Sequence, residues 1–311
     1  MRSKGRSPVV AIVGAGRVGC ALGRRLHQKG WRIGPVITRS MRTARAARRR
    51  IGSGKPQAGL SEAVLAADLI LIATPDRAIP ETAEALARLG GSSRFGAKRA
   101  PGGKRIFGSE AWRGKIVLHT SGAVGSDVLK PLTLRGAAIG SLHPLQTFSG
   151  RTIPELSGST CAIAGSAGAL RAARRVCSEL GGVPVVLPPG RKAAYHAAAA
   201  LAAGHVLAVI EAAVRILVSV GFARKAAVRA LVPLTRQTLE NYEGVGSRAA
   251  WTGPLSRGDF AVIERHLEAL RHFPREYRGA YDALSRLGVN VLANRGGSKS
   301  RQLEQMLARI K

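Results

Sequence analysis

The sequence predicts an α/β protein in which a doubly wound sheet is followed by an all-helical second domain. Up to residue 187, short apolar runs alternate with segments of helical periodicity, and a glycine-rich turn joins the first run to the first helix. After the Pro-Pro-Gly sequence at 188–190, β-branched runs bounded by turns no longer occur, and long alanine-rich segments follow. Alternating strands and helices are typical of a sheet covered by helices on both faces.

The chain opens with a strand, a turn, a helix and a second strand. Residues 8–13 are apolar and β-branched, residues 18–29 place apolar side chains on one helical face, and residues 32–38 form the next apolar run. This length is that of a βαβ unit. The alternation then continues, with helices expected at 60–66, 78–89 and 167–180 and strands at 68–74, 114–120, 138–142, 160–164 and 183–187.

The length of 311 residues fits two domains. We assign residues 1–189 to the sheet domain, residues 190–293 to the helical domain and residues 294–311 to a basic tail. A segment rich in Gly, Ser, Lys and Arg at about 90–113 is interpreted as a basic, solvated loop insertion. The second domain is expected to hold helices at 191–220, 223–241 (with Pro233 as the place where it would kink), 259–270 and 275–287.

The turn after the first strand has the pattern of a dinucleotide-binding loop. Gly14 permits a tight turn, Gly16 lets a diphosphate approach the backbone, and Gly19 lets the helix pack against the strand. The amides around Arg17 and Val18 then point at the phosphates from the positive end of the helix dipole. Because a strand enters this loop and an apolar-periodic helix leaves it, we predict a Rossmann domain.

The end of the second strand selects the cofactor. NAD enzymes usually place an acidic residue there, where it binds the ribose hydroxyls. This chain has Thr38, Arg39 and Ser40 at that point, with Arg42 close by and no acid. Arg39 and Ser40 can receive a 2′-phosphate, so NADP is favoured over NAD.

Polar residues follow three strands, at the sheet edge where ligands of open α/β proteins bind. Thr74 and Pro75 (before Asp76) follow one strand, His119 and Ser121 another, and His143 a third. His119 and Thr74 are expected near the cofactor, and His143 and Ser121 are candidates for acid–base catalysis. Asp76 either faces the ligand or caps the next helix, and each histidine has a hydrogen-bonded structural role as its alternative.

The helical half adds further candidates. Tyr195 and His196 open the long helix, and His196 is a candidate proton donor beside the nicotinamide, or else a packed residue at the domain junction. Arg257 would grip a substrate carboxylate or phosphate. Asp259 is expected to bind substrate or to cap the next helix. His205 lies nine residues after His196, on the opposite face of a straight helix.

Bulk composition narrows the classes of function. The formal charge is +31, from 49 Lys and Arg against 18 Asp and Glu, but these cations are spread along the chain without interleaved aromatic residues. We therefore expect nucleic acid to bind only non-specifically, if at all. Cys20, Cys161 and Cys177 lack metal spacing and are expected to be reduced thiols, and we expect no membrane segment and no secretion signal. The protein is predicted to be cytoplasmic.

Several motifs together resemble a known family. GAGRVG, ATPD, GKIVLHTSGA, SLHPLQTF, AAYHAAAALAA and TGPLSRGD occur in the order found in Rossmann-like proteins with the domain of unknown function 2520. That family is similar to pyrroline-5-carboxylate reductase, prephenate dehydrogenase and deazaflavin-dependent NADP oxidoreductases. The resemblance implies an NADP-binding domain, an all-helical dimerising domain, oxidoreductase activity and an inter-domain cleft. This cleft would be lined by Gly14, Gly16, Gly19, Thr74, Pro75, His119, Ser121, Gly122, His143, Pro144, Tyr195, His196, Gly253, Pro254, Arg257, Gly258 and Asp259. The chain departs from the family at Gly204 and His205, where an asparagine and an aromatic residue are common.

Three functions stay open. The first is an NADP-dependent oxidoreductase acting on a small carbonyl, imine or hydroxyl compound, with the alanine-rich helix indicating a homodimer. The second is a non-catalytic NADP-binding sensor or scaffold protein, which the departure at Gly204 and His205 favours. The third is a basic protein that associates non-specifically with nucleic acid.

Overall fold

The computed structural model describes residues 8–90, 98–99, 105–106, 109–292 and 298–309. The chain divides into two compact units, Met1–Ala203 and Gly204–Lys311, so the first unit extends beyond the boundary expected at 189. Most of the loop insertion expected at 90–113 lies outside the described residues, as do residues 294–297 and 310–311 of the expected tail. The described part of that tail forms helix α12 (Ser298–Arg309).

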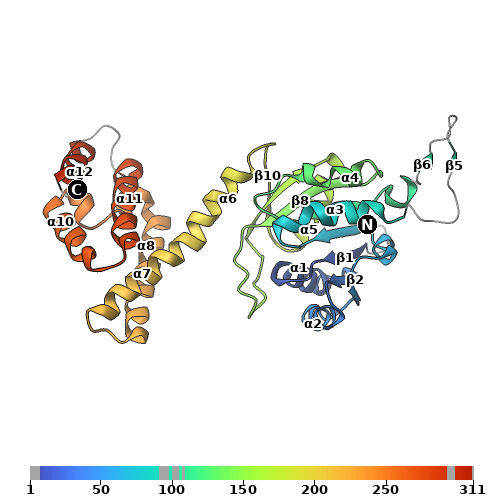
Figure 1. Ribbon diagram of the computed structural model, residues 1–311, viewed down its shortest axis with the longest axis horizontal. Helices are drawn as coiled ribbons and strands as arrows, with labels where there is room; N and C mark the ends of the chain where they lie inside the picture. Colours follow the sequence, from blue (N-terminus) through green and yellow to red (C-terminus); the bar gives the residue numbers. More distant parts are fainter. Residues whose placement is uncertain (1–7, 91–97, 100–104, 107–108, 293–297, 310–311) are drawn as a thin grey trace. The chain divides into compact units, whose positions relative to one another are not determined.

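The first unit is built on one eight-stranded sheet (Figure 1). Its strand order is β10-β9-β8-β7-β4-β1-β2-β3. All neighbouring strands are parallel except β8 and β9, which are antiparallel. The strands are β1 (Val9–Val13), β2 (Arg32–Thr38), β3 (Lys55–Ala58), β4 (Leu69–Ile72), β7 (Ile116–His119), β8 (Ala138–Pro144), β9 (Thr160–Gly165) and β10 (Val183–Val186). A separate two-stranded ladder pairs β5 (Lys98–Arg99) with β6 (Arg105–Ile106).

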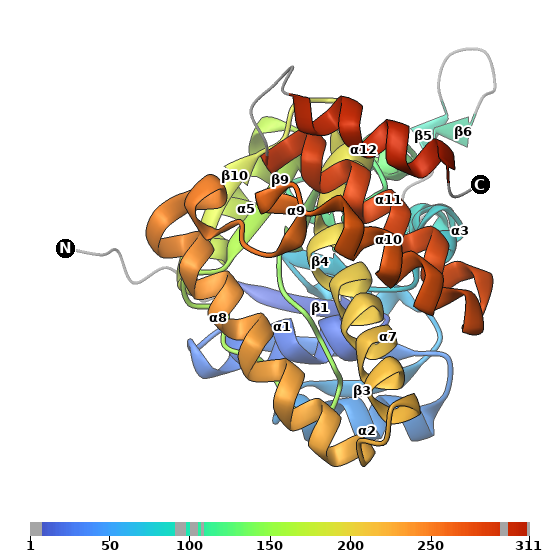
Figure 2. The same ribbon diagram turned by 90° about the vertical axis from the view of Figure 1, so that its left-hand side faces the viewer.

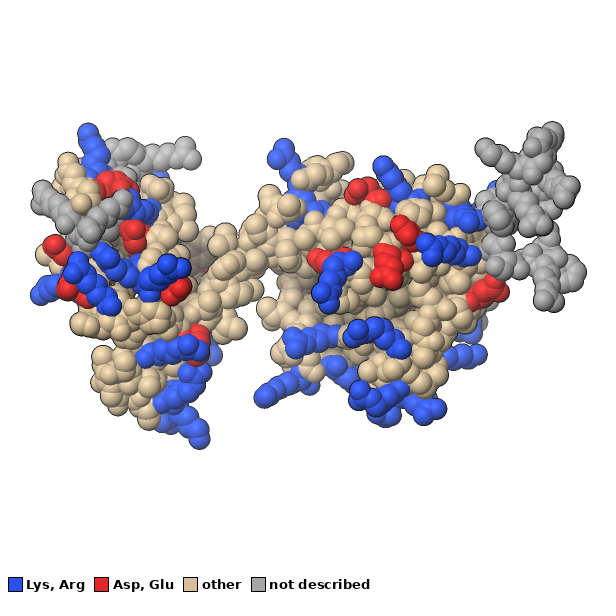
Figure 3. Space-filling model, in the orientation of Figure 1, with Lys and Arg blue, Asp and Glu red and all other residues tan. Residues whose placement is uncertain are grey.

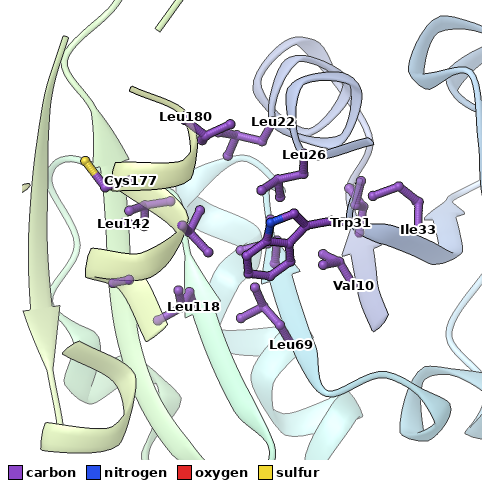
Figure 4. Packing of buried hydrophobic residues seen from close by; sticks show 14 of the residues in the cluster. Val10, Leu22, Leu26, Trp31, Ile33, Leu69, Leu118, Leu142, Cys177 and Leu180 are labelled. Atoms are coloured by element: carbon purple, nitrogen blue, oxygen red, sulfur yellow. The ribbon is translucent and has the colours of Figure 1, made fainter. Parts of the chain in front are cut away.

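Helices cover both faces of this sheet, which confirms the predicted fold class. They are α1 (Arg17–Gln28), α2 (Met41–Ile51), α3 (Ile79–Arg88), α4 (Lys130–Thr133) and α5 (Ala167–Glu179), with short 3-10 segments η1 (Glu62–Ala66), η2 (Asp76–Ala78), η3 (Ser109–Trp112) and η4 (Ser126–Leu129). Side chains that alternate along β1 divide between two cores. Val10 and Ile12 join the cluster of Figure 4, with Leu22, Leu26 and Leu118. Ala11 and Val13 join the opposite cluster, with Ile79 and Leu86 of α3.

Helix α2 and strand β3 were not expected from the sequence. Helix α2 is rich in arginine, and its only buried residues are Ala44, Ala47 and Ile51, which lie at helical spacing. Three apolar positions among so many arginines make the pattern hard to recognise in the sequence. Ser40 caps the helix by accepting a hydrogen bond from the Thr43 amide at 3.3 Å, and Gly52 ends it with a φ of 87°. Serine is a common residue at the start of a helix, and a left-handed glycine is a common residue at its end.

The second unit is helical throughout its described residues. It contains α7 (Val206–Ser219), α8 (Arg224–Ala250), α9 (Pro254–Arg257), α10 (Phe260–Ala269), η6 (Leu270–His272), α11 (Arg275–Leu292) and α12. Helices α10, α11 and α12 lie side by side (Figure 2) and enclose a small core of Ile263, Leu267, Val289, Leu303 and Met306. Helix α8 keeps helical dihedrals at Pro233. It breaks at Gly246, whose φ is 78° and ψ is 171°, and the kink at Pro233 stays a prediction.

A single long helical segment joins the two units. Helix α6 (Lys192–Ala200) passes through a π-helical turn, η5 (Leu201–His205), into α7. This turn has more residues than a regular α-helical turn, so the spacing that placed His205 on the face opposite His196 does not apply. The segment Lys192–Ser219 is long and apolar enough to cross a membrane. Core helices of soluble proteins and signal sequences meet the same criterion, so the finding is weak evidence for a membrane span.

The basic side chains are spread over the surface, as the sequence predicts. Blue Lys and Arg side chains are scattered over both units on the face shown in Figure 3, with few red acidic side chains between them.

Cys20, Cys161 and Cys177 are free and buried. Burial raises the pKa of each thiol, which keeps the unreactive protonated form dominant.

Candidate active site

The predicted site segments of the first unit meet at one edge of the sheet. Strands β1, β4, β7 and β8 run parallel, with Val13 beside Ile72, Ile72 beside His119 and His119 beside Ser141. The residues at the carboxyl ends of these strands, or directly after them, therefore lie at the same edge of the sheet. They are the glycine turn at 14–19, Thr74 to Asp76, His119 to Gly122, and His143.

The three glycines of the turn have three different environments. Gly14 has a φ of +83°, and a Cβ there would lie 2.6 Å from the Thr74 backbone nitrogen. A Cβ on Gly19 would lie 2.9 Å from the Gly14 carbonyl oxygen, whereas a Cβ on Gly16 would meet nothing within 4 Å. Gly14 and Gly19 therefore close the turn, and Gly16 leaves open space above it. Its neighbours Arg17 and Val18 begin α1, where amides have no intrahelical partner. This arrangement fits a diphosphate.

Arg39 and Ser40, the two residues predicted to bind a 2′-phosphate at the end of β2, differ in whether their side chains are free to do so. Ser40 uses its hydroxyl locally, since it accepts from the Thr43 amide and lies 2.9 Å from Thr43 Oγ1. Arg39 and Arg42 are exposed. Of this group, the two guanidinium groups are the ones available to an anion, while Ser40 shapes the helix start beside them.

Buried polar atoms at this edge lack partners among the described residues. They are Thr74 Oγ1, Ser141 Oγ and His196 Nδ1. A buried hydroxyl or imidazole without a hydrogen bond costs free energy and usually marks a place for a ligand or water. Thr74 also contacts the glycine turn, because its Cγ2 lies 2.7 Å from where a Cβ on Gly14 would be. Thr74 thus fits a role beside a cofactor.

His119 holds the turn after β7 through both ring nitrogens. Nδ1 accepts from the Ser121 amide at 3.2 Å, which leaves the proton on Nε2, 3.2 Å from the Gly125 carbonyl oxygen. The side chain is fully buried, and burial, followed by the charge of Lys192, lowers its pKa to about 3. His119 is therefore a neutral structural residue near the predicted cofactor edge.

Ser121 was predicted as a proton relay, but its hydroxyl is already saturated. It donates to Asp76 Oδ2 at 2.7 Å and accepts from the amides of Ala123 (3.1 Å) and Val124 (3.0 Å). A hydroxyl has one hydrogen and two lone pairs, so no capacity is left for a substrate. Ser121 instead positions Asp76, whose carboxylate faces this turn. The N-cap position of η2 belongs to Pro75.

Three aromatic side chains cluster beyond this turn. His143 Nδ1 and the Tyr195 hydroxyl are 2.8 Å apart, and the rings of His143 and His196 stand edge to face at 5.8 Å. A Cβ on Gly122 would lie 2.6 Å from His196 Nδ1 and 2.9 Å from His143 Nε2. Burial lowers the pKa of His143 to about 4 and raises that of Tyr195 to about 12, so both are uncharged near neutral pH.

Lys192 is the residue that the sequence analysis missed. Its side chain is 6% exposed, and Nζ donates to the Ser121 carbonyl oxygen at 2.6 Å. Burial lowers its pKa to about 8, against an opposing effect of Asp76. Lys192 lies one helical turn before His196 on α6, so both residues face the same edge. A lysine in an otherwise apolar, alanine-rich helix start was the available signal.

A cavity of about 610 Å³ adjoins the aromatic cluster. It is lined by His143, Leu145, Gln146, Thr147, Tyr195, His196, Ala198, Ala199, Ala200, Ala202 and Ala203, all within the first unit. The predicted residues Arg257 and Asp259 belong to the second unit. Arg257 is exposed in α9, and Asp259 occupies the N-cap position of α10 without a side-chain capping bond.

Family models match both parts of the chain. A Rossmann-like domain matches residues 3–100 and 106–144, and the domain of unknown function 2520 matches residues 159–287. No curated protein sequence matches the chain.

Solved structures share the fold at low sequence identity. A protein from Bacteroides fragilis assigned as an NADP oxidoreductase is 21% identical, with a TM-score of 0.69 over 90% of this chain and 97% of its own. A reductive aminase from Aspergillus terreus, in complex with NADPH and ethyl-5-oxohexanoate, is 16% identical, with a TM-score of 0.63 over 96% and 99%. An imine reductase from Pseudomonas sp. is 19% identical, with a TM-score of 0.60 over 97% and 100%.

Proposed function

We propose that this chain, whose two parts match a Rossmann-like domain and the domain of unknown function 2520, is an NADP-dependent oxidoreductase that acts on a small carbonyl, imine or hydroxyl compound. The observation that carries this proposal is the glycine turn, in which Gly14 and Gly19 leave no room for a side chain and Gly16 is open. The amides of Arg17 and Val18 would bind the diphosphate, and Thr74, with its unpaired hydroxyl, would bind the cofactor next to it. The likeness to an NADPH-bound reductive aminase and to an imine reductase supports the reaction type.

The preference for NADP is assigned to Arg39 and Arg42. Both are exposed beside the end of β2, and no acid lies there to repel a 2′-phosphate. Titration with NADPH and NADH should show that Arg39→Glu weakens NADPH binding by about tenfold or more and leaves NADH binding much less affected. Arg49→Glu, in the last turn of α2, makes the same charge change away from the helix start and serves as the control. If both variants lost the same NADPH affinity, the cofactor would be attracted by the overall positive charge of the protein and not by Arg39 itself.

When bound, NADPH supplies the hydride, and the protein must supply the proton to the carbonyl oxygen or imine nitrogen. We assign this proton to His196, whose Nδ1 is buried and unpaired. Lys192, one turn earlier, holds a positive charge behind the reacting group while it orients the turn after β7. His143, held by Tyr195, positions the ring of His196.

The decisive experiment combines binding with turnover. Wild-type protein and His196→Gln are titrated with NADPH and then assayed for NADPH oxidation with a panel of carbonyls and imines. We expect equal NADPH affinity, and turnover reduced about 100-fold or more in the variant. NADPH binding without oxidation by any compound of the panel would favour the alternative, a non-catalytic NADP sensor or scaffold. Failure to bind nicotinamide nucleotides would refute both.

We also propose that the protein is a homodimer. Large apolar side chains are exposed along the hairpin of α7 and α8, including Leu207 (66%), Leu234 (64%) and Val245 (63%). Apolar patches of this extent usually mark an interface. Light scattering after size exclusion should return twice the chain mass. A monomer in plain buffer would refute the dimer, and a chain recovered only with detergent or lipid would indicate that a membrane covers this surface. The buried reduced thiols suit the cytoplasm, where we expect the protein to work.

A further inference from the structure

The cavity beside the aromatic cluster has two unlike ends. Toward the sheet it ends on the polar atoms of His143, Tyr195 and His196, which lie close to Gly122. The rest of its lining consists of alanines of α6 and η5, among them Ala199 and Ala202, and of Leu145, Gln146 and Thr147, which follow β8. A ligand in this cavity would therefore meet hydrogen-bonding groups at the aromatic cluster and mainly hydrocarbon along the alanines of the helix.

The lining of the cavity also lacks the cationic side chains, Lys and Arg, that usually bind a carboxylate. Among the described residues, those that line it include no Lys, Arg, Asp or Glu. His143 and Tyr195 are both held uncharged by burial. The ammonium group of Lys192 is turned to the Ser121 carbonyl oxygen, and Lys192 is not among the lining residues. A carboxylate beside the exposed Ala202 and Ala203 would gain no cationic partner from the lining. One placed at the half-buried end beside His143 would also lose hydration, which is unfavourable.

We infer that this cavity receives an uncharged, largely apolar ketone or imine, and not an amino acid, hydroxy acid or other carboxylate. The C=O or C=N group lies at His143, Tyr195 and His196, and the hydrocarbon part lies along Ala199, Ala202 and Ala203. This inference rests on the proposed reductase function. In the reaction the C=O or C=N carbon gains a hydride from NADPH, the oxygen or nitrogen gains one proton, and NADP⁺ is released. The volume of about 610 Å³ is that of a site for a small organic molecule.

The first test compares matched substrates on the full chain with NADPH. The pairs are 4-methylcyclohexanone with 4-oxocyclohexanecarboxylate, and 2-methyl-1-pyrroline with 1-pyrroline-2-carboxylate. We expect kcat/KM to be about tenfold or more higher for the uncharged member of a pair. Equal values, or a preference for the acid, would overturn the inference. If Arg257→Ala then removed a preference for the acid, Arg257 would be the anion-binding residue instead.

The second test reads binding without turnover. Saturation-transfer NMR compares 1-methylcyclohexanol with 1-hydroxycyclohexanecarboxylate, neither of which presents a reducible group. Ala202→Phe fills the cavity, and Ala194→Phe makes the same change at an exposed position of α6 outside the lining. We expect transfer to the alcohol in wild type and Ala194→Phe and its loss in Ala202→Phe, with NADPH affinity unchanged in all three.

The two proposals can fail separately. Turnover of the acids with no transfer to the alcohol would refute the cavity assignment and leave the reductase intact. Specific binding of the alcohol, lost in Ala202→Phe, together with no NADPH oxidation by any compound, would refute the reductase and keep the apolar site. Binding of neither ligand would overturn the inference.

Discussion

The Nζ atom of Lys192 lies 2.6 Å from the carbonyl oxygen of Ser121, so the first turn of α6 is tied to the turn that follows β7. The lysine is almost fully buried, and its ammonium group is enclosed beside the neutral rings of His119 and His143. Through this one contact, the charge of Lys192 and the placement of His196 become coupled. Its removal should therefore alter both the pH dependence and the rate of the proposed reaction.

Lys192→Met should abolish a pH transition. Because the pKa of Lys192 is lowered to about 8, turnover that needs the ammonium group falls as pH rises through about 8 in the wild-type protein. The variant should be slower by about tenfold or more below that pH and show no such transition. Lys192→Arg keeps a charge that titrates above this range. A pH profile of kcat/KM from pH 6 to 10 measures this, and an unchanged transition in Lys192→Met would assign it to another group.

His119 should make the protein sensitive to acid. Its folded pKa of about 3 lies below the ordinary value, so between about pH 6.5 and pH 3 the unfolded chain binds a proton that the folded chain does not. The free energy of unfolding should therefore fall as pH falls through this window, with His119 contributing about 2–3 kcal/mol between pH 7.5 and pH 4.5. Urea unfolding at the two pH values measures this. His119→Gln should reduce the difference, whereas an equal difference in both proteins would contradict it.

Gly122→Ala should displace the aromatic cluster. The added Cβ would lie 2.6 Å from His196 Nδ1, so the imidazole must move by several tenths of an ångström. We expect turnover to fall by about tenfold to 100-fold while the fold is retained, because the displaced atoms belong to side chains. Gly279→Ala is the control, since a Cβ on this helical residue of α11 meets nothing within 4 Å. That change should stabilise the protein by about 0.5–1 kcal/mol. Wild-type turnover in Gly122→Ala would show that His196 does not act at this position.

Two glycines of the first turn should respond in opposite ways. Gly14→Ala forces a side chain into the left-handed region, 2.6 Å from the Thr74 backbone, and should cost several kcal/mol of stability. Gly16→Ala meets no atom and should leave thermal unfolding unchanged, yet weaken NADPH binding by about tenfold or more, because its methyl group occupies the place of the diphosphate. Calorimetry and thermal melts separate the two effects. Unchanged NADPH affinity in Gly16→Ala would place the diphosphate elsewhere.

The sheet domain follows from local sequence signals, and the exceptions have physical reasons. Strand β4 is recognisable because both of its faces are buried, so its residues form one apolar run. Helix α2 was missed because three buried residues suffice to anchor it, and arginines fill the rest of its surface. In α8 the break falls at Gly246, where a positive φ is tolerated, while Pro233 fits into helical geometry.

The sequence indicated where the site residues lie, but it did not indicate the role of each side chain. Residues at strand ends can be located from sequence, since parallel strands share an edge. Whether a side chain is free to react depends on hydrogen bonds that only the folded turn creates. Ser121 is saturated by two amides and Asp76, and His119 by the Ser121 amide and the Gly125 carbonyl. Lys192 needed the fold as well, because its burial comes from a turn some 71 residues away in sequence.

The burial of Cys20, Cys161 and Cys177, with their raised thiol pKa values, gives this chain a practical property. A maleimide dye should react slowly with the natural protein and rapidly with a cysteine introduced at an exposed position. Pairs of such labels on either side of the π-helical turn at Leu201–His205 would report by energy transfer whether nucleotide binding bends the long helix.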